Sequence, residues 1–307
     1  MEGHRSLTHS LLFAFVVAPL CGWLVFHLYT RLSAESCHFS SQKRASYWDW
    51  TKLFFFGFVT HWLLDCFTTW GTQIFYPFSR NGVAWKTIFV IDPLYTLPFM
   101  FFLLWASFKG KNNPKRRILN IIGLTLSTLY LGFTVINKQL INQVFEEALQ
   151  KQKIEYLEFD THPTPLNNIL WSANVKTKTG YYMAYYSFFD TDKEIDFVFL
   201  KKNEHLLGEL KNQEKLQSLI RVTQDYYTVN MIDNQLIIND LRFGKVNVWQ
   251  NKLDGEFVFS YQIENKNNEL KIEKIKSDLA IDWQTLKLFH KRIFGEKNVE
   301  LVFDSTF

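Results

Sequence analysis

The sequence is poor in cysteine throughout and poor in charge in its first half. The three cysteines of the 307-residue chain are Cys21, Cys37 and Cys66, so the second half has none with which to build a disulfide framework. Residues 1–137 hold 12 Lys/Arg and 5 Asp/Glu, a net charge of +7, whereas residues 138–307 hold 22 Lys/Arg and 25 Asp/Glu, a net charge of −3. The chain therefore joins two unlike halves, an apolar one and an ordinary charged one.

Charge is almost absent from four stretches, which are each about 20 residues long and thus long enough to cross a bilayer. These stretches are residues 11–30, 53–72, 87–108 and 118–137. The first and last contain no Asp, Glu, Lys or Arg, and the other two contain only Asp65 and Asp92 as charged residues. Four helices in series that are apolar on every face indicate a membrane domain, here residues 1–137. The mild basic excess lies in the short loops between these stretches, where it indicates membrane orientation. We therefore expect membrane lipids, and no nucleic acid, as partners.

The loops between these stretches predict the orientation in the membrane. The loop after the third stretch has five basic residues and no acid, and the loop after the first is also basic, so both should be cytoplasmic. The loop 73–86 carries only Arg80 and Lys86. This arrangement places the N-terminus, the loop 73–86 and everything after residue 137 outside the cytoplasm.

The second half lacks a Gly-rich phosphate loop, a nucleophile elbow and a Cys-rich metal site. Its apolar patterns predict a soluble, extracytoplasmic α+β domain over residues 151–307, with a mostly antiparallel sheet, after a linker over residues 138–150. We expect this domain to fold without the membrane half. His162 could reach the membrane face, although a plain loop histidine is the simpler interpretation, and Arg242 fits core packing better than a substrate platform. The expected strands lie at 153–159, 181–190, 195–200, 231–238, 246–249, 257–263 and 270–275, and the expected helices at 203–220 and 281–294.

Ionisable side chains inside the apolar stretches are the candidate functional residues, because they are costly in lipid and mark functional sites. His61 and Asp65 are one helical turn apart and so share a face. Asp92 lies six residues after Lys86, or roughly 9 Å below the outer surface at 1.5 Å per residue. Imidazole and carboxylate together are a ligand set for zinc, or with more oxygens for manganese or iron.

Each of these residues also has a purely structural interpretation. His61 and Asp65 could be a hydrogen-bonded pair that holds helices together. Asp92 followed by Pro93 could be a helix start, with the acid at the cap and proline in the first turn. Against these interpretations, His4 and His9 stand at the outer mouth of the first stretch, so that several such residues converge on one depth. His27, at the inner end of that stretch, is expected to have no role.

Several short motifs follow one another along the chain. They are His4-Arg5-Ser6-Leu7-Thr8-His9-Ser10, His61-Trp62-Leu63-Leu64-Asp65, Thr69-x-Gly71-Thr72-Gln73, Pro77-Phe78, Ile91-Asp92-Pro93, Pro163-Thr164-Pro165-Leu166-Asn167 with Leu170-Trp171, and Asp240-Leu241-Arg242-Phe243-Gly244. In their order and spacing these motifs resemble those of the YdjM-like family of inner-membrane, metal-dependent hydrolases. The likeness extends over nearly all of the chain. In using a helical His-x-x-x-Asp pair, the sequence is also similar to zinc-dependent phospholipases C, which hints at the substrate class.

The resemblance implies a multi-pass protein of the bacterial inner membrane that hydrolyses its substrate with a divalent metal ion, zinc being the first choice. It implies that His61, Asp65 and Asp92 are catalytic, and that these three with His4 and His9 are metal ligands. Members of that family usually carry a further apolar region, ending in a Pro-Asp-x-Asp type motif, before the His-Arg segment, whereas this chain opens at Met1-Glu2-Gly3-His4. The family would therefore supply ligands that this sequence does not show.

Two functions from different classes follow. The first is a membrane-bound metal-dependent hydrolase that acts on a lipid-linked, phosphoester or other envelope substrate at the outer side of the inner membrane. The second is a non-enzymatic membrane protein, whose extracytoplasmic domain binds a partner and whose His/Asp cluster is structural. Tightly bound metal after purification would separate the two.

Overall fold

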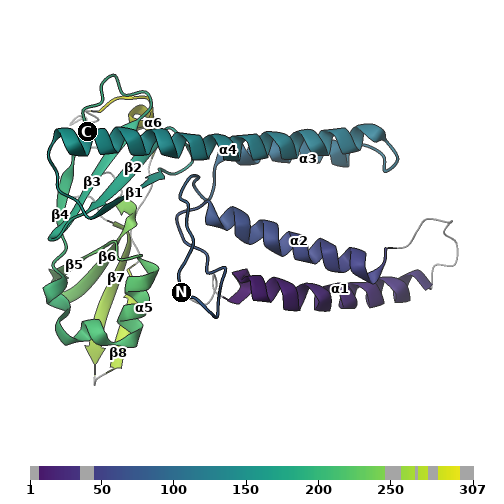
Figure 1. Ribbon diagram of the computed structural model, residues 1–307, viewed down its shortest axis with the longest axis horizontal. Coiled ribbons are helices and arrows are strands. Elements are labelled where there is room, and N and C mark those ends of the chain that lie inside the picture. Colours follow the sequence, from purple (N-terminus) through teal and green to yellow (C-terminus); the bar gives the residue numbers. More distant parts are fainter. Residues whose placement is uncertain (1–6, 35–44, 246–256, 267–268, 276–282, 298–307) are drawn as a thin grey trace, which may run out of the picture. The chain divides into compact units, whose positions relative to one another are not determined.

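The computed structural model describes residues 7–34, 45–245, 257–266, 269–275 and 283–297. The chain forms two compact units, residues 1–86 and 87–307. Within the described residues, the long helices come first and the strands follow, with shorter helices between and after the strands (Figure 1). The helices are η1 (Leu7–His9), α1 (Leu11–Ala34), α2 (Tyr47–Cys66), α3 (Pro93–Ser107), α4 (Pro114–Lys151), η2 (Glu204–Asn212), α5 (Glu214–Val222) and α6 (Trp283–Ile293). The strands are β1 (Glu158–Pro163), β2 (Leu170–Lys176), β3 (Gly180–Ser187), β4 (Val198–Lys201), β5 (Tyr227–Ile232), β6 (Gln235–Lys245), β7 (Phe257–Lys266) and β8 (Glu269–Lys274).

The first unit is a helical hairpin of α1 and α2. Ser46 starts α2 with a capping box, since its hydroxyl accepts from the backbone N–H of Asp49 and the Asp49 carboxylate accepts from the backbone N–H of Ser46. The two helices pack closely at Gly22, where an added Cβ would lie 2.5 Å from the Thr51 hydroxyl oxygen. This close approach is open only to glycine and fixes how α1 lies along α2.

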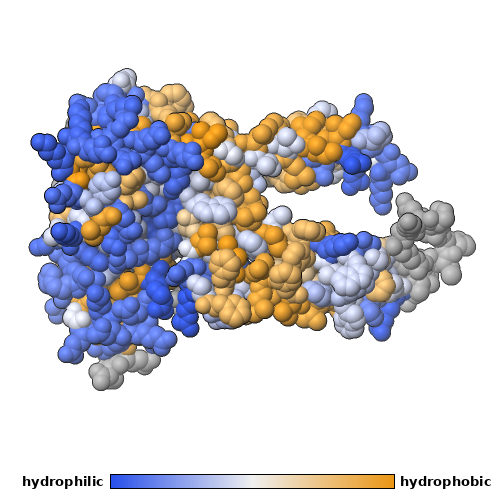
Figure 2. All heavy atoms as spheres, viewed as in Figure 1, coloured by the Kyte–Doolittle hydropathy of each residue, from blue (hydrophilic) through white to orange (hydrophobic). Residues whose placement is uncertain are grey.

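The second unit begins with another helical hairpin, α3 and α4. Asp92 and Asn113 are the N-cap residues of these helices, and each is followed by a proline in the first turn. An added Cβ at Gly123 of α4 would lie 3.0 Å from the Phe102 Cβ of α3, so the two helices touch there. The surfaces of the apolar helices are largely hydrophobic, whereas the surface of the strand-containing part is largely hydrophilic (Figure 2).

Two helices, not four, are long and apolar enough to count as candidate membrane spans among the described residues: Leu11–Leu32 and Pro114–Lys151. Four membrane spans are therefore not shown by the described residues. Helix α3 has 15 residues, or about 22 Å, because Asp92 and Pro93 delay its start. Helix α2 ends at Cys66 rather than at residue 72, and residues 67–70 form a turn and bends before Gly71, which has a φ of +82°.

Helix α4 continues well beyond its apolar stretch. It has 38 residues, so residues 138–150, which the sequence analysis treats as a linker, are helical. Ile141, Phe145 and Ala148 from this part pack against Trp171 and Ala184 of the first sheet. The apolar helix and the sheet are thus joined by one continuous helix.

The strands form two four-stranded antiparallel sheets, with the orders β1-β2-β3-β4 and β5-β6-β7-β8. Helix α4 covers one face of the first sheet, and η2 and α5 pack against the second sheet around Leu207, Leu216 and Tyr227. Tyr181 and Met183 of β3 meet Leu241 of β6 in a third cluster, which joins the two sheets. The expectation of a soluble, mostly antiparallel domain is confirmed, but as two sheets instead of one.

The strand expectations were wrong in three places. The expected strand at 153–159 overlaps β1 (Glu158–Pro163) in only two residues, because residues 152–157 form the turn and loop after α4. Residues 231–238 are not one strand, because Asp233 and Asn234 both have positive φ (48° and 61°) and make the turn between β5 and β6. Strand β2 was not expected at all, since it is buried on both faces and shows no apolar–polar alternation. The expected strand at 246–249 lies outside the described residues.

Candidate metal centre

His9, His61 and Asp65 meet at the end of the first hairpin where α1 begins and α2 ends. His9 closes the short helix η1, and the Ser10 hydroxyl accepts a hydrogen bond of 3.1 Å from the Phe13 N–H in the first turn of α1. Because α1 and α2 run in opposite directions, the start of α1 lies beside the last turns of α2. The His9 Nε2 atom is 3.2 Å from the Asp65 Oδ2 atom.

His61 joins the pair from α2 itself, one turn before Asp65. Its Nε2 atom is 3.9 Å from the same Asp65 oxygen, and the two imidazole rings of His9 and His61 are 5.2 Å apart at their centroids. The spacing expected from the sequence is therefore confirmed, and His9 supplies the third group. One ligand atom from each residue lies within 4.8 Å of the others.

Burial differs sharply among the three side chains. The His9 side chain is 7% exposed and that of Asp65 is 19% exposed, whereas that of His61 is 67% exposed. The group is thus closed on the side of His9 and open on the side of His61. A site that is open on one side leaves room for a substrate beside the ligands.

Thr8 fixes the ring of His9. Its hydroxyl oxygen lies 2.9 Å from the His9 Nδ1 atom, so the two atoms share a hydrogen bond. When Nδ1–H is the donor, Nε2 carries the lone pair that a metal ion needs, and the ring orientation is held by the outer partner. Thr8 was not expected to have a role, although its place next to His9 in the motif was a signal.

The loop after α2 folds back onto this end of the hairpin. The backbone N–H of Leu11 donates to the Ile74 carbonyl at 2.9 Å, and Thr72 and Val83 exchange two backbone hydrogen bonds of 2.9 Å. The Trp85 N–H donates to the Cys66 carbonyl, which returns the chain to the end of α2. The loop therefore braces both helix ends that carry the candidate ligands.

The donor set fits a divalent metal ion. Around a tetrahedral zinc ion with ligand atoms at about 2.1 Å, neighbouring ligand atoms are about 3.4 Å apart. The separations of 3.2 and 3.9 Å from Asp65 Oδ2 are close to that value. Two imidazoles and one carboxylate are also a ligand set that zinc accepts in sites with an open fourth position.

Asp92 belongs to the second unit, where it makes the helix start that its sequence context allows. Its Oδ1 atom accepts from the backbone N–H groups of Leu94 and Tyr95 at 2.9 and 3.3 Å. Its Oδ2 atom accepts from the Tyr130 hydroxyl of α4 at 3.0 Å. The structural interpretation of Asp92 is thus confirmed, while its catalytic and metal-binding roles stay predictions.

The remaining candidates are less informative. His4 lies outside the described residues. His162 is a buried strand residue of β1 opposite Ser172, and not a loop histidine. Arg242 is buried and forms an ion pair of 2.7 Å with Asp240, in keeping with its expected core position. His27 is exposed on α1, where its Nδ1 atom contacts the Trp23 carbonyl at 3.1 Å.

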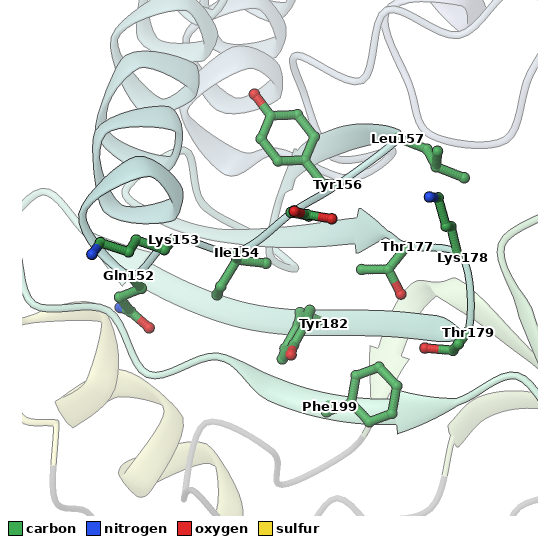
Figure 3. A pocket seen from close by; sticks show the side chains of 11 residues that line it. Gln152, Lys153, Ile154, Tyr156, Leu157, Thr177, Lys178, Thr179, Tyr182 and Phe199 are labelled. Atoms are coloured by element: carbon green, nitrogen blue, oxygen red, sulfur yellow. The ribbon is translucent and has the colours of Figure 1, made fainter.

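A separate cavity of about 490 Å³ lies where α4 ends above the first sheet (Figure 3). Tyr182 and Phe199 of the sheet form an aromatic floor, with ring centroids 5.0 Å apart. Lys153 and Lys178 stand at the rim. Glu155 is the one carboxylate in the lining, which has no His or Cys, so this cavity is not a metal centre.

Comparison with known proteins bears on the membrane half. No curated protein and no solved structure matches the chain. A family model matches residues 1–141. These residues include the first candidate span, the second as far as residue 141, and the group of His9, His61 and Asp65. The matching family is described as YdjM inner membrane protein, and for residues 1–141 this confirms the resemblance to the YdjM-like family.

Proposed function

We propose that the protein is a multi-pass membrane enzyme, a metal-dependent hydrolase with its centre at His9, His61 and Asp65. The observation that carries the proposal is the convergence of three ligand atoms within 4.8 Å, contributed by α2 and by the short helix η1 that precedes α1. A divalent ion held there would supply Lewis-acid polarisation of a scissile group and would lower the pKa of a coordinated water.

The side chains would divide the work according to their burial. Buried His9, oriented by Thr8, would hold the ion from the closed side. Asp65 would supply the negative charge that partly offsets the charge of a divalent cation. Exposed His61 would stand at the open side, where a substrate enters.

We infer that the centre faces the outer side of the inner membrane. In this arrangement α1, α2, α3 and α4 all cross the bilayer, with the basic residues of 109–117 in the cytoplasm and the β domain outside. The short helix α3 would cross with the help of the apolar residues 87–91 that precede it. A substrate that reaches this site would be lipid-linked, a phosphoester or another envelope component.

Hydrolysis tests the proposal directly. The full chain, reconstituted in lipid vesicles with added zinc, should release the coloured alcohol from a chromogenic phosphodiester or phosphomonoester. Asp65→Asn should abolish this release while His27→Ala keeps it, because His27 lies on the same helix pair but outside the group. Equal activity of wild type and Asp65→Asn would contradict the proposal.

The non-enzymatic alternative has one observation in its favour. The cavity with the Tyr182 and Phe199 floor is a place where the extracytoplasmic domain could receive part of a partner. In that case the contact of 3.2 Å between His9 and Asp65 would only hold α1 to α2. Metal content separates the two functions, because the alternative needs none.

A further inference from the structure

Among the large apolar side chains that are exposed on the largely hydrophilic β domain, four come from segments that lie close together where β3 and α6 end (Figure 2). They are Leu166, Phe188, Phe189 and Phe294, with exposed fractions of 49, 37, 51 and 54%. Leu166 comes from the loop between β1 and β2, the two neighbouring phenylalanines follow β3, and Phe294 follows α6. We refer to these four residues as the apolar patch. Exposure of a contiguous apolar patch marks an interaction site.

A ring stack and a backbone hydrogen bond connect the segments that carry the apolar patch. The rings of Phe189 and Phe294 stack with centroids 5.3 Å apart and an interplanar angle of 13°. Gly295 makes this approach possible, because its φ is +93° and an added Cβ would lie 2.3 Å from the Phe189 carbonyl oxygen. The Phe188 N–H donates to the Ile169 carbonyl at 3.2 Å, which ties β3 to the loop of Leu166.

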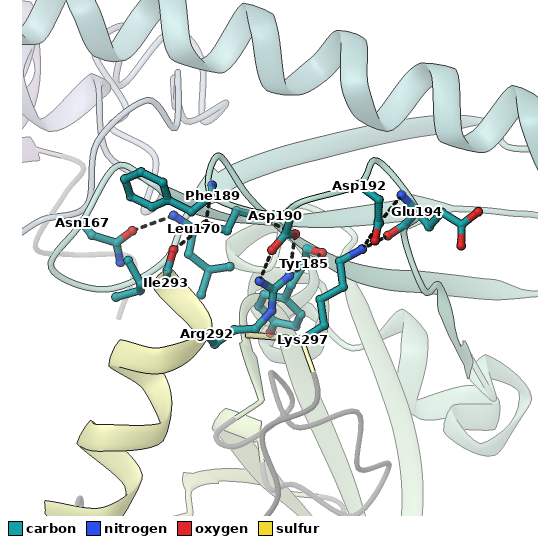
Figure 4. Close-up of polar contacts among 11 residues, drawn as sticks. Asn167, Leu170, Tyr185, Phe189, Asp190, Asp192, Glu194, Arg292, Ile293 and Lys297 are labelled. Atoms are coloured by element: carbon teal, nitrogen blue, oxygen red, sulfur yellow. Dashed lines mark hydrogen bonds and ion pairs between the residues drawn. The ribbon is translucent and has the colours of Figure 1, made fainter. Parts of the chain in front are cut away.

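A buried ion pair supports the apolar patch from beneath. Arg292 at the end of α6 donates to both oxygens of Asp190 at 2.6 and 3.0 Å, and the two side chains are 5% and 0% exposed (Figure 4). The Ser187 hydroxyl of β3 donates a further hydrogen bond between these segments, to the Ile293 carbonyl of α6. The end of α6 is therefore fixed rigidly to the end of β3, and the exposed rings are held in place.

The loop of the apolar patch lies at the level where the apolar face of α4 ends. Exposed apolar side chains follow α4 from Ile118 (54%) to Leu140 (46%), a rise of about 33 Å, which matches a bilayer core of about 30 Å. Asn137 Nδ2 donates to Asn168 Oδ1 at 2.9 Å. Leu166, two residues before Asn168, thus stands near the end of the stretch that the bilayer would cover.

Helix α6 has the composition of an interfacial helix. It contains no acidic residue, its Lys and Arg residues besides the buried Arg292 are Lys287 and Lys291, and its Trp283 and Leu286 are 79% and 41% exposed. Basic groups beside exposed aromatic and aliphatic side chains favour the headgroup region of a membrane, where phosphates and acyl chains meet. The composition of α6 and the position of the apolar patch thus both favour contact with a lipid bilayer.

We propose that the apolar patch is a second membrane contact, which inserts into the lipid surface next to α4 and seats the β domain against the bilayer. The occupant is the lipid bilayer itself. The proposal requires that α4 crosses the membrane, because the span sets the level of the patch. It does not depend on metal binding or hydrolysis at His9, His61 and Asp65.

The test uses the full chain with its native cysteines replaced by alanine (Cys21→Ala, Cys37→Ala and Cys66→Ala) and one new cysteine carrying an NBD dye. Positions 189 and 294 report on the apolar patch through Phe189→Cys and Phe294→Cys. Met231→Cys is the matched control, because Met231 is 51% exposed, as Phe189 is, but lies on the second sheet. Leu129→Cys, at a 65% exposed position of α4, reports on the span itself.

Each labelled protein is placed in nanodiscs with plain lipids or with lipids brominated on the acyl chain, and the NBD fluorescence is compared. We expect about twofold lower fluorescence in brominated lipid at 189, 294 and 129, and no change at 231. If either phenylalanine variant fails to fold, Leu166→Cys takes its place with the same expectation. Quenching at position 129 without quenching at positions 189 and 294 would overturn the proposal. No quenching at position 129 would also overturn it, because α4 would then not cross the membrane.

Discussion

The hydroxyl of Tyr130 on α4 donates a hydrogen bond of 3.0 Å to Asp92, the residue that caps α3. One carboxylate thus serves two helices, because its other oxygen accepts from the first backbone N–H groups of α3. Asp92 is 2% exposed, so these partners replace the water that its charge would otherwise hold. The arrangement gives Asp92 a structural role that a mutation can separate from metal binding.

Replacing Asp92 with alanine should destabilise the α3–α4 hairpin, because the cap and the contact with Tyr130 are both lost. Loss of an N-cap costs about 0.5–2 kcal/mol, and loss of the hydrogen bond about 1 kcal/mol more. Asp92→Asn should cost far less, since asparagine caps a helix as well as aspartate does. Chemical unfolding of the full chain in detergent measures both values, and a stable Asp92→Asn variant that has lost its metal would identify Asp92 as a ligand.

The last turns of α4 should be required for folding of the β domain. Ile141 and Phe145 are fully buried against the first sheet, so a fragment 151–307 would leave that face bare. We expect fragment 138–307 to unfold cooperatively on heating and fragment 151–307 to aggregate. As a point-mutation control, Phe145→Ala in the longer fragment should cost about 3–5 kcal/mol. A folded 151–307 fragment would show that α4 is dispensable for this core.

Stability should fall at acidic pH partly through Glu204. Partial burial acts to raise the pKa of Glu204, but the hydrogen bond from Tyr227 and the ammonium groups of Lys211 and Lys202 outweigh it and lower the pKa to about 2. A carboxyl with a lowered pKa contributes stability that is present above its unfolded value of about 4.5 and is lost as the pH falls toward 2.

The Glu204→Gln variant should therefore lose less unfolding free energy than wild type when the pH is lowered from about 5 to about 2. This window runs from just above the unfolded pKa of Glu204 to its folded pKa. Denaturant unfolding of the full chain at a series of pH values measures this. Glu214→Gln, which removes an exposed carboxylate of α5, is the control and should keep the wild-type profile. Identical profiles for wild type and Glu204→Gln would contradict the role of Glu204.

Topology can be tested with reporters that work only in the cytoplasm. A reporter fused after Asn112, in the basic loop between α3 and α4, should be active. The same reporter fused after Gln150, near the end of α4, should be inactive, because α4 carries the chain across the membrane. Activity only at Gln150 would invert the orientation and place the His/Asp group at the inner face.

Local sequence patterns correctly predicted features that are set by residues close in the chain, such as helix starts and shared helix faces. Asp92 followed by Pro93 predicted a helix start, and the spacing of His61 and Asp65 predicted a shared face. The helical continuation of α4 was also within reach, since Ile141, Phe145 and Ala148 recur at helical spacing. The domain was nonetheless expected to begin after them, because composition alone marks residue 138 as the start of a polar segment.

Features that depend on tertiary structure were out of reach. The sequence placed His9 and Asp65 at one depth, but their contact of 3.2 Å depends on how α1 packs against α2, which no local pattern encodes. Strand β2 is buried on both faces and so lacks the alternation by which a half-buried strand is recognised. The turn at Asp233 and Asn234 lies within a run that reads as one strand, although both residue types tolerate positive φ.

The most direct test of the account is the metal content of the purified full chain. Zinc, manganese and iron should be measured by elemental analysis in wild type, in Asp65→Asn, His61→Ala and His9→Ala, and in the control His27→Ala, with thermal stability in detergent measured in parallel. The account predicts near-stoichiometric metal in wild type and in His27→Ala, and its loss in the three site variants with the fold retained. Full metal retention in Asp65→Asn, or metal-free wild type that is nonetheless active, would contradict a metal centre at His9, His61 and Asp65.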